Sequence, residues 1–201
     1  MQKALPAKNT GMARISVDTR SGLVHPARFV SSPNHDRRPG DEAPSLVVVH
    51  GISLPPGEFG GDYIDRLFTN TLDPCAHPYF ASIARLRVSS HLLVRRDGRL
   101  VQYVPLHLRA WHAGQSCWRG RERCNDYSIG IELEGTDDRP YEPVQYDTLA
   151  GLIHALRGAY PGITDDAIAG HADIAPGRKT DPGPAFDWQR LQRCLHDNAR
   201  G

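Results

Sequence analysis

Residues 45–50 read SLVVVH, and this short apolar run constrains the fold more than any other feature of the sequence. Four consecutive apolar residues, three of them valine, are typical of a strand that is buried on both faces of a sheet. Such a strand lies inside a sheet that other elements cover. His50 ends the run, so a polar side chain stands where a rigid strand meets a loop, a position that functional groups favour.

Other patterns supply the remaining elements of a mixed α/β domain. Residues 127–134, YSIGIELE, alternate between apolar and polar side chains and predict a second strand. Residues 88–104 hold two apolar runs around Asp97-Gly98, which predicts a hairpin closed by a tight primed turn. Helices are expected at 62–69, 78–86, 146–160 and 188–195. We therefore expect a central sheet of about four to six strands flanked by helices. The irregular order of strands and helices argues against a doubly wound nucleotide-binding fold.

The chain has 201 residues, a length typical of one domain. Residues 1–22 are polar and lack periodicity, so we expect an N-terminal extension that is disordered or artefactual, with Met12 as an alternative start. Residues 26–44 are rich in proline and predict an irregular lead-in. We find no internal repeat or linker, and residues 23–201 are therefore expected to form a single domain.

The balance of charges argues against a broad class of partners. Lys and Arg number 24 against 23 Asp and Glu, and this net charge of +1 gives no electrostatic footprint for nucleic acid or an anionic membrane. No apolar run reaches the roughly 18 residues of a membrane helix, and the N-terminus lacks the apolar core of a signal peptide. We therefore expect a cytoplasmic protein whose four cysteines are reduced thiols, with a Cys117–Cys124 disulfide as the alternative. Because no large exposed apolar helix face is evident, we also expect a monomer.

Residues 170–184, GHADIAPGRKTDPGP, concentrate polar side chains in a segment whose Pro and Gly content predicts a loop. His171 and Asp181 converge if this loop doubles back. Two neutral imidazoles and one carboxylate are the ligands of many catalytic zinc sites, so His50, His171 and Asp181 are candidate zinc ligands. Such a site keeps a position open for water, whose pKa zinc lowers toward about 7. No short motif links these three residues, so their spacing alone does not establish a metal site. The alternative for His50 is a histidine at a strand end that bonds to a carbonyl.

Hydrolysis at zinc also needs a general base and a group that stabilises the oxyanion. Glu132 and Glu134 share the polar face of the second strand, and the pattern does not separate them; a solvent-facing edge residue is the alternative. Lys179 is the candidate cation, or else a solvated loop lysine. Trp111 in RAWHAG and nearby Arg123 form a second cluster, which suits either a sugar- or anion-binding surface or a tryptophan packed on the sheet.

Five segments together resemble a known enzyme family: VVVHGISLPPGEFGG, RVSSHLLVRRDGRLVQYVP, RAWHAG, GRERCNDYSIGIELEGTD and GHADIAPGRKTDPGPAFDW. From about Pro26 to Leu191 the chain resembles AmpD-type 1,6-anhydro-N-acetylmuramyl-L-alanine amidases. These are cytoplasmic zinc enzymes of the N-acetylmuramoyl-L-alanine amidase type 2 superfamily. The resemblance implies a mixed β-sheet packed by helices, shared with peptidoglycan recognition proteins and phage amidases.

The resemblance also implies a role for each candidate residue. The family's zinc ligands fall on His50, His171 and Asp181. Its catalytic glutamate falls on Glu132 and not on Glu134, and its catalytic lysine falls on Lys179. Its substrate-contacting segments fall around Arg87, Trp111 and Arg123. One position departs from the family, because Gly51 stands where asparagine is frequent, and this puts a substrate contact in doubt.

The implied reaction is cleavage of the amide between the lactoyl group of 1,6-anhydro-N-acetylmuramic acid and L-alanine of the stem peptide. Its setting would be cytoplasmic peptidoglycan recycling and, indirectly, β-lactamase induction. Three competing hypotheses are a non-catalytic peptidoglycan-binding module, an amidase of the intact wall, and a zinc peptidase. The full set of candidate ligands argues against the first, the missing signal peptide against the second, and the missing HExxH helix against the third.

Overall fold

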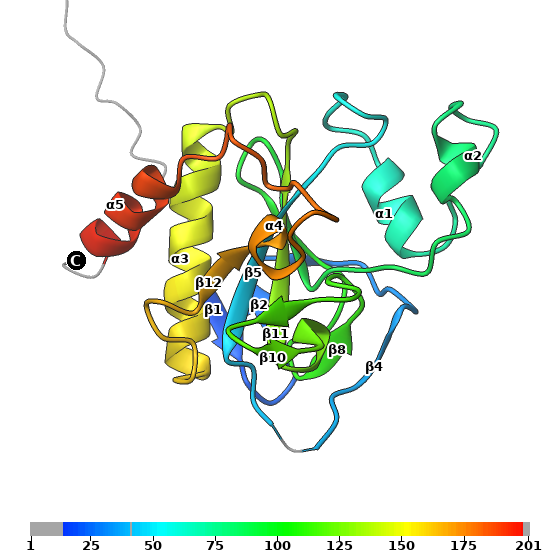
Figure 1. Ribbon diagram of the computed structural model, residues 1–201. Coiled ribbons are helices and arrows are strands. Elements are labelled where there is room, and N and C mark those ends of the chain that lie inside the picture. The colour runs from blue at the N-terminus through cyan, green and yellow to red at the C-terminus, as the bar shows by residue number, and fades with distance from the viewer. Residues whose placement is uncertain (1–13, 41, 199–201) are drawn as a thin grey trace, which may run out of the picture.

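The computed structural model describes residues 14–40 and 42–198, and a six-stranded mixed sheet forms its centre (Figure 1). In spatial order the strands are β12 (Ile168–Gly170), β5 (Leu46–Ile52), β11 (Ser128–Glu134), β6 (Leu92–Val94), β7 (Leu100–Gln102) and β3 (Arg28–Phe29). The first four run parallel, β7 is antiparallel to β6, and β3 is parallel to β7. The expected α/β class is confirmed. The SLVVVH strand has a parallel neighbour on each side, which explains its apolar run.

One face of the sheet packs against α3 (Pro143–Ala159), and α5 (Trp188–Asn198) packs against α3; both helices lie to the left of the sheet in Figure 1. Proline at the first position of α3 suits a helix start, because its missing N–H has no intrahelical partner there. The odd-numbered residues of β5 and β11 join the buried face of α3 in one cluster: Val47, Val49, Ile129, Ile131, Leu133, Tyr146, Leu149, Ile153 and Leu156. The alternation seen in the sequence therefore faces the helical layer.

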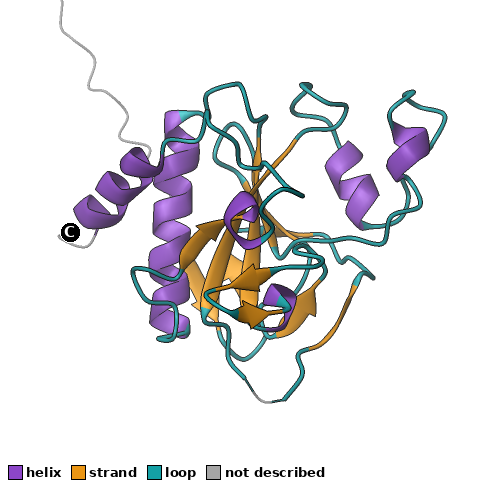
Figure 2. Ribbon diagram, in the orientation of Figure 1, coloured by secondary structure: helices purple, strands orange, loops and turns teal. Residues whose placement is uncertain are grey.

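The opposite face of the sheet carries α1 (Tyr63–Phe68) and α2 (Phe80–Ile83), which stand to the right of the orange strands in Figure 2. Their apolar residues pack with the other side of β6 and β7: Ile64, Leu67, Phe68, Phe80, Leu93 and Val101. On this face β5 and β11 present their even-numbered residues. His50 and Glu132 are register partners in the parallel pair, so two chemically active side chains stand side by side.

Two parts of the chain are more ordered than expected. Within residues 14–22, β1 (Ser16–Asp18) pairs with β2 (Leu23–His25), and Ile15 and Val17 pack against the α3 core. The expectation of a disordered or artefactual extension is therefore wrong for this part, because its few apolar residues find a buried partner. Residues 1–13 lie outside the described residues. The expected irregular lead-in holds β3 and also β4 (His35–Arg37), which pairs with β8 (Leu108–Ala110).

Short elements complete the fold: β9 (Cys117–Trp118), β10 (Arg121–Glu122), the 3₁₀ helix η1 (Cys124–Asp126) and α4 (His171–Ile174). α4 replaces part of the predicted 170–184 loop, because Asp173 Oδ2 accepts the Gly170 N–H at 2.7 Å and starts a turn of helix. The hairpin at 88–104 is confirmed, but its turn differs: Gly98 has positive φ and Asp97 does not, so it is not the primed turn predicted. All four cysteines are free thiols.

Among the described residues, no helix combines the length and the apolar character needed to span a bilayer.

Candidate active site

Three side chains from separate segments converge at the carboxyl ends of β5 and β12. His50 comes from β5, His171 opens α4 directly after β12, and Asp181 follows on the returning loop. His50 Nδ1 lies 2.9 Å from His171 Nδ1, and Asp181 Oδ2 lies 3.1 Å from His171 Nδ1 and 3.3 Å from His50 Nδ1. The Ala172 N–H donates to the Asp181 carbonyl oxygen at 2.9 Å, which holds the loop against α4. The three candidate ligands predicted from the sequence are therefore brought together.

Their spacing suits a tetrahedral cation. Zinc with ligands at about 2.0–2.2 Å in tetrahedral geometry places its donor atoms about 3.3–3.6 Å apart. The three separations measured here run from 2.9 to 3.3 Å. Two imidazole nitrogens and one carboxylate oxygen also match the ligand preference of zinc. The residues present thus fit the metal that the sequence resemblance implies.

Electrostatics favours the protonation states that metal binding requires. Burial lowers the pKa of His50 to about 4, although the nearby Asp181 carboxylate opposes this shift. Burial alone would raise the pKa of Asp181, but the neighbouring His171 and His50 outweigh it and hold that pKa well below its usual range. At neutral pH His50 is therefore a neutral imidazole and Asp181 a carboxylate, the forms that coordinate a cation.

Glu134 is buried on β11 and fully engaged by neighbouring segments. Its Oε1 accepts the Gly60 N–H at 2.7 Å and the Arg95 Nη1 at 3.1 Å, and its Oε2 accepts the Arg96 N–H at 3.2 Å. These bonds join β11 to the loop before α1 and to the β6–β7 hairpin. The carboxylate of Glu134 therefore holds these segments together, and it does not line the cavity that contains the candidate ligands.

Glu132 lies two residues earlier on the same face and lines the cavity beside His50. Its side chain is buried, and this burial raises its pKa well above the ordinary value. The Asp181 carboxylate adds to the rise, and Lys179 opposes it. A carboxyl group that holds a proton more readily than usual, beside three candidate metal ligands, is suited to general acid and base chemistry.

A cavity of about 560 Å³ opens above the three ligands, which is a size typical of small-molecule sites. Glu132, Lys179 and Trp111 line it together with the ligands. The Trp111 Nε1–H donates to Asp36 Oδ1 at 3.2 Å, which fixes the indole at the cavity wall. The other wall is apolar and comes from α1, α2 and neighbouring loops: Leu54, Pro56, Leu67, Phe68, Tyr79, Ile83 and Leu86. The helical spacing predicts that α1 forms but not where it packs, so sequence reasoning missed this wall.

Two predicted substrate contacts do not line this cavity. Arg87 is exposed and donates to Asn70 Oδ1 at 3.4 Å, although its neighbours Leu86 and Val88 belong to the wall. Arg123 is exposed, pairs with Asp126 at 3.0 Å and lines a separate hollow of about 400 Å³. Their contact with substrate stays a prediction.

Comparison with known proteins decides the family. The family model described as N-acetylmuramoyl-L-alanine amidase, Amidase_2, matches residues 40–184. The chain belongs to this amidase family. A relative from Escherichia coli strain K12, named 1,6-anhydro-N-acetylmuramyl-L-alanine amidase AmpD, is 64% identical over 171 residues, which cover 85% of this chain and 93% of that protein. The resemblance found in the sequence is confirmed.

Solved structures agree with this assignment. A crystal structure of an AmpD selenomethionine derivative superposes with a TM-score of 0.86 and 61% identity, over 89% of this chain and 98% of that chain. AmpDh3 from Pseudomonas aeruginosa, solved in complex with an anhydromuramic pentapeptide, gives a TM-score of 0.58 and 28% identity over 75% of this chain and 59% of that chain. The mixed sheet and its helical layers are therefore the amidase fold.

Gly51 lines the cavity of the amidase directly after the first candidate ligand. A Cβ atom at this position would lie 2.4 Å from the Tyr141 hydroxyl oxygen. That hydroxyl donates to the Pro182 carbonyl oxygen at 2.9 Å, next to Asp181. Any side chain at position 51 therefore requires Tyr141 to move, so the missing asparagine leaves a space that Tyr141 already occupies.

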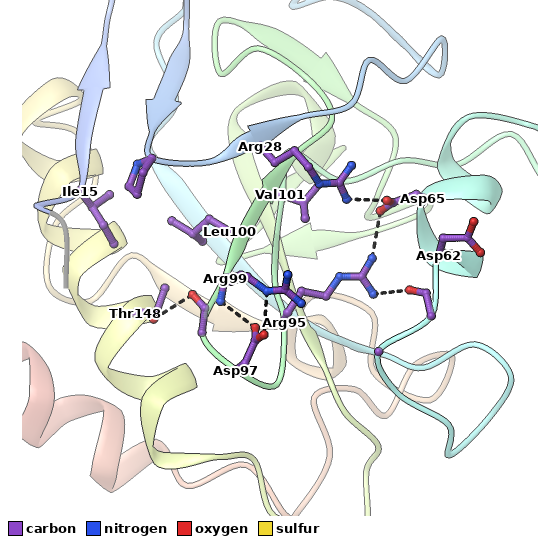
Figure 3. Close-up of a pocket in the computed structure, with 14 residues that line it drawn as sticks. Ile15, Arg28, Asp62, Asp65, Arg95, Asp97, Arg99, Leu100, Val101 and Thr148 are labelled. Atoms are coloured by element: carbon purple, nitrogen blue, oxygen red, sulfur yellow. Dashed lines mark hydrogen bonds and ion pairs between the residues drawn. The ribbon is translucent and has the colours of Figure 1, made fainter. Parts of the chain in front are cut away.

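A further hollow in the amidase, with a volume of about 530 Å³, lies between α1, the β6–β7 hairpin and α3. Figure 3 shows the side chains that line it. Its charged side chains neutralise one another: Asp65 pairs with Arg28 at 2.6 Å and with Arg95 at 3.1 Å, and Arg99 pairs with Asp97 at 2.7 Å. The residues that line it include none of the candidate ligands or catalytic groups. This hollow is therefore separate from the candidate active site.

Proposed function

We propose that the amidase binds one zinc ion through His50, His171 and Asp181 and cleaves 1,6-anhydro-muropeptides. The scissile bond is the amide between the lactoyl group of 1,6-anhydro-N-acetylmuramic acid and L-alanine of the stem peptide. The observation that carries the proposal is the convergence of three donor atoms within 3.3 Å of one another in a cavity lined by Glu132 and Lys179. The name of the AmpD relative and the AmpDh3 complex support the choice of substrate.

A zinc ion held by these three residues would supply a Lewis acid for the scissile carbonyl and would lower the pKa of water. Glu132 accepts the proton of the attacking water and later delivers it to the leaving amine nitrogen. Its buried position beside Asp181, which raises its pKa, suits a group that must hold that proton between the two steps. Lys179, an exposed side chain that lines the cavity, donates to the oxygen on which negative charge develops.

The remaining predicted contacts orient the substrate. Trp111, held by Asp36, presents its ring to the cavity and suits the apolar face of a sugar. Arg87 and Arg123 lie on exposed segments outside the cavity, where a guanidinium suits the carboxylates of a peptide chain. We propose these three side chains as substrate contacts.

The biological setting follows from this substrate. We propose that the protein acts as a cytoplasmic monomer in peptidoglycan recycling, without a nucleic acid or membrane partner. Removal of anhydro-muropeptides would also lower the signal for β-lactamase induction in bacteria that use such muropeptides for it.

The proposal is tested by incubating the purified protein with a defined 1,6-anhydro-muropeptide and with its non-anhydro counterpart. Mass spectrometry follows release of the intact stem peptide with and without a chelator. We expect release from the anhydro form only, abolished by the chelator and restored by zinc. Equal cleavage of both forms would point to turnover of the intact wall. No cleavage of either, by protein shown to contain zinc, would favour a binding module.

A further inference from the structure

A chain of hydrogen bonds leads from His50 into the protein interior. His50 Nε2 lies 2.9 Å from His112 Nδ1, and His112 Nε2 lies 3.1 Å from Ser128 Oγ. Ser128 Oγ in turn lies 2.5 Å from the carbonyl oxygen of Cys124. All four residues are buried. His112 belongs to the RAWHAG segment, of which the proposed reaction uses only Trp111.

The inner end of this chain sets its direction. A carbonyl oxygen only accepts, so the Ser128 hydroxyl donates its single proton to Cys124. Ser128 Oγ therefore accepts from the His112 Nε2–H. A neutral imidazole has one N–H, so His112 Nδ1 is an acceptor and the His50 Nε2–H donates to it. The other nitrogen of His50, Nδ1, is left with a lone pair that faces His171 and Asp181.

The residue after His112 determines the tautomer of the second histidine ligand. His171 Nε2 lies 3.3 Å from the carbonyl oxygen of Ala113. Because that oxygen only accepts, His171 carries its proton on Nε2 and its lone pair on Nδ1. The backbone N–H groups of His112 and Ala113 both donate to Asn125 Oδ1, at 3.1 and 2.8 Å. One amide side chain thus holds the dipeptide that faces both histidines.

These assignments leave three lone-pair atoms facing one another, an arrangement that is repulsive without a cation among them. We propose that the dipeptide His112-Ala113 is the positioning element of the zinc site, which fixes both histidine ligands in the tautomer that directs Nδ1 at the metal. The inference rests on the proposed zinc amidase. In this role His112 acts through His50, so it is a positioning residue.

The packing around His112 holds its imidazole ring in a defined position. A Cβ atom at Gly130 would lie 2.5 Å from Cγ of His112. The glycine in the YSIGIELE strand therefore makes room for the imidazole against the sheet. The rings of His50 and His112 meet edge to face, with centroids 5.0 Å apart. A side chain on β11 at this point would displace the acceptor on which the tautomer of His50 depends.

The test compares His112→Asn with His112→Phe in the full-length, zinc-loaded protein. The Asn Oδ1 stands near the place of His112 Nδ1 and keeps an acceptor for His50, whereas Phe fills the volume without one. We expect the zinc Kd, measured by competition with a chelator, to rise about 10–100-fold in His112→Phe. His112→Asn should recover most of that loss. If His112→Phe does not fold, Ser128→Ala provides the test in its place. This variant removes the acceptor of His112 and should also weaken zinc binding.

A spectroscopic readout separates orientation from packing. In the zinc-loaded wild type, ¹⁵N NMR of the imidazoles should show that His112 is protonated on Nε2 and unprotonated on Nδ1. The opposite tautomer would overturn the inference. So would equal losses of zinc affinity in the Asn and Phe variants, or no loss in either variant and in Ser128→Ala. A wild type that binds no zinc would instead overturn the proposed function.

Discussion

Glu132 and Glu134 are chemically identical, share one face of β11 and are both buried. Their surroundings indicate different roles for the two carboxylates. Glu134 accepts three hydrogen bonds from neighbouring segments, whereas Glu132 faces the cavity with His50. The alternation of the sequence places both on the polar face and goes no further, because the partners of Glu134 come from segments that only the folded chain brings together. The choice of Glu132 came from the family resemblance.

This difference gives a prediction at the scale of the residue. Glu132→Gln removes the group that carries the proton but none of the three metal ligands. Turnover of the anhydro-muropeptide should fall by about 10²–10⁴-fold, with zinc content and thermal stability retained. Asp181→Ala is the matched comparison and should lose tightly bound zinc. Steady-state kinetics and metal analysis check both variants, and a Glu132→Gln enzyme that turns over at the wild-type rate would exclude the assigned role.

Among the elements, those with a strong local pattern could be predicted and those made by long-range pairing could not. The hairpin at 88–104 and α3 follow from turn residues and helical spacing. By contrast, β4 is a three-residue strand that exists because β8 pairs with it, and nothing in its own sequence requires this. The cavity wall from α1 and α2 has the same origin. The sequence pattern predicts candidate active-site residues at the ends of strands, but it does not predict the apolar wall that encloses them.

Glu134 provides the prediction at the scale of elements, because its carboxylate fastens β11 to the hairpin and to the loop before α1. Glu134→Ala leaves the Gly60 and Arg96 N–H groups without this acceptor and takes one partner from buried Arg95. The free energy of unfolding should fall by about 3–5 kcal/mol. Chemical denaturation measures the change, with exposed Glu122→Ala as the control that should stay near the wild type. A change below about 0.5 kcal/mol would show that these bonds do not hold the elements together.

At the scale of the whole molecule, the sheet separates two kinds of interior. The face under α3 is apolar, whereas the other face combines the apolar contacts of α1 and α2 with a group of buried histidines. His91 lies at 0% exposure in this second interior: its Nδ1 accepts the Gly130 N–H at 3.0 Å, and its Nε2 lies 3.0 Å from the Leu108 carbonyl oxygen. Burial, assisted by the nearby Arg38 guanidinium, lowers the pKa of His91 well below its ordinary value. The folded protein therefore keeps a neutral imidazole that the unfolded chain protonates.

This difference makes the stability of the molecule depend on pH. Below about pH 6.5 the unfolded state binds a proton at His91 that the native state refuses, so the free energy of unfolding falls as pH decreases. The contribution is up to about 1.4 kcal/mol per pH unit until the native pKa is reached. His91→Asn keeps an acceptor for Gly130 but cannot titrate. Denaturation of both zinc-loaded proteins from pH 8 to pH 5 should give parallel stabilities above about pH 7 and a steeper loss for the wild type below it. Parallel stabilities over the whole range would show that His91 does not stay neutral in the folded protein, because only an unequal uptake of protons by the two states creates a slope.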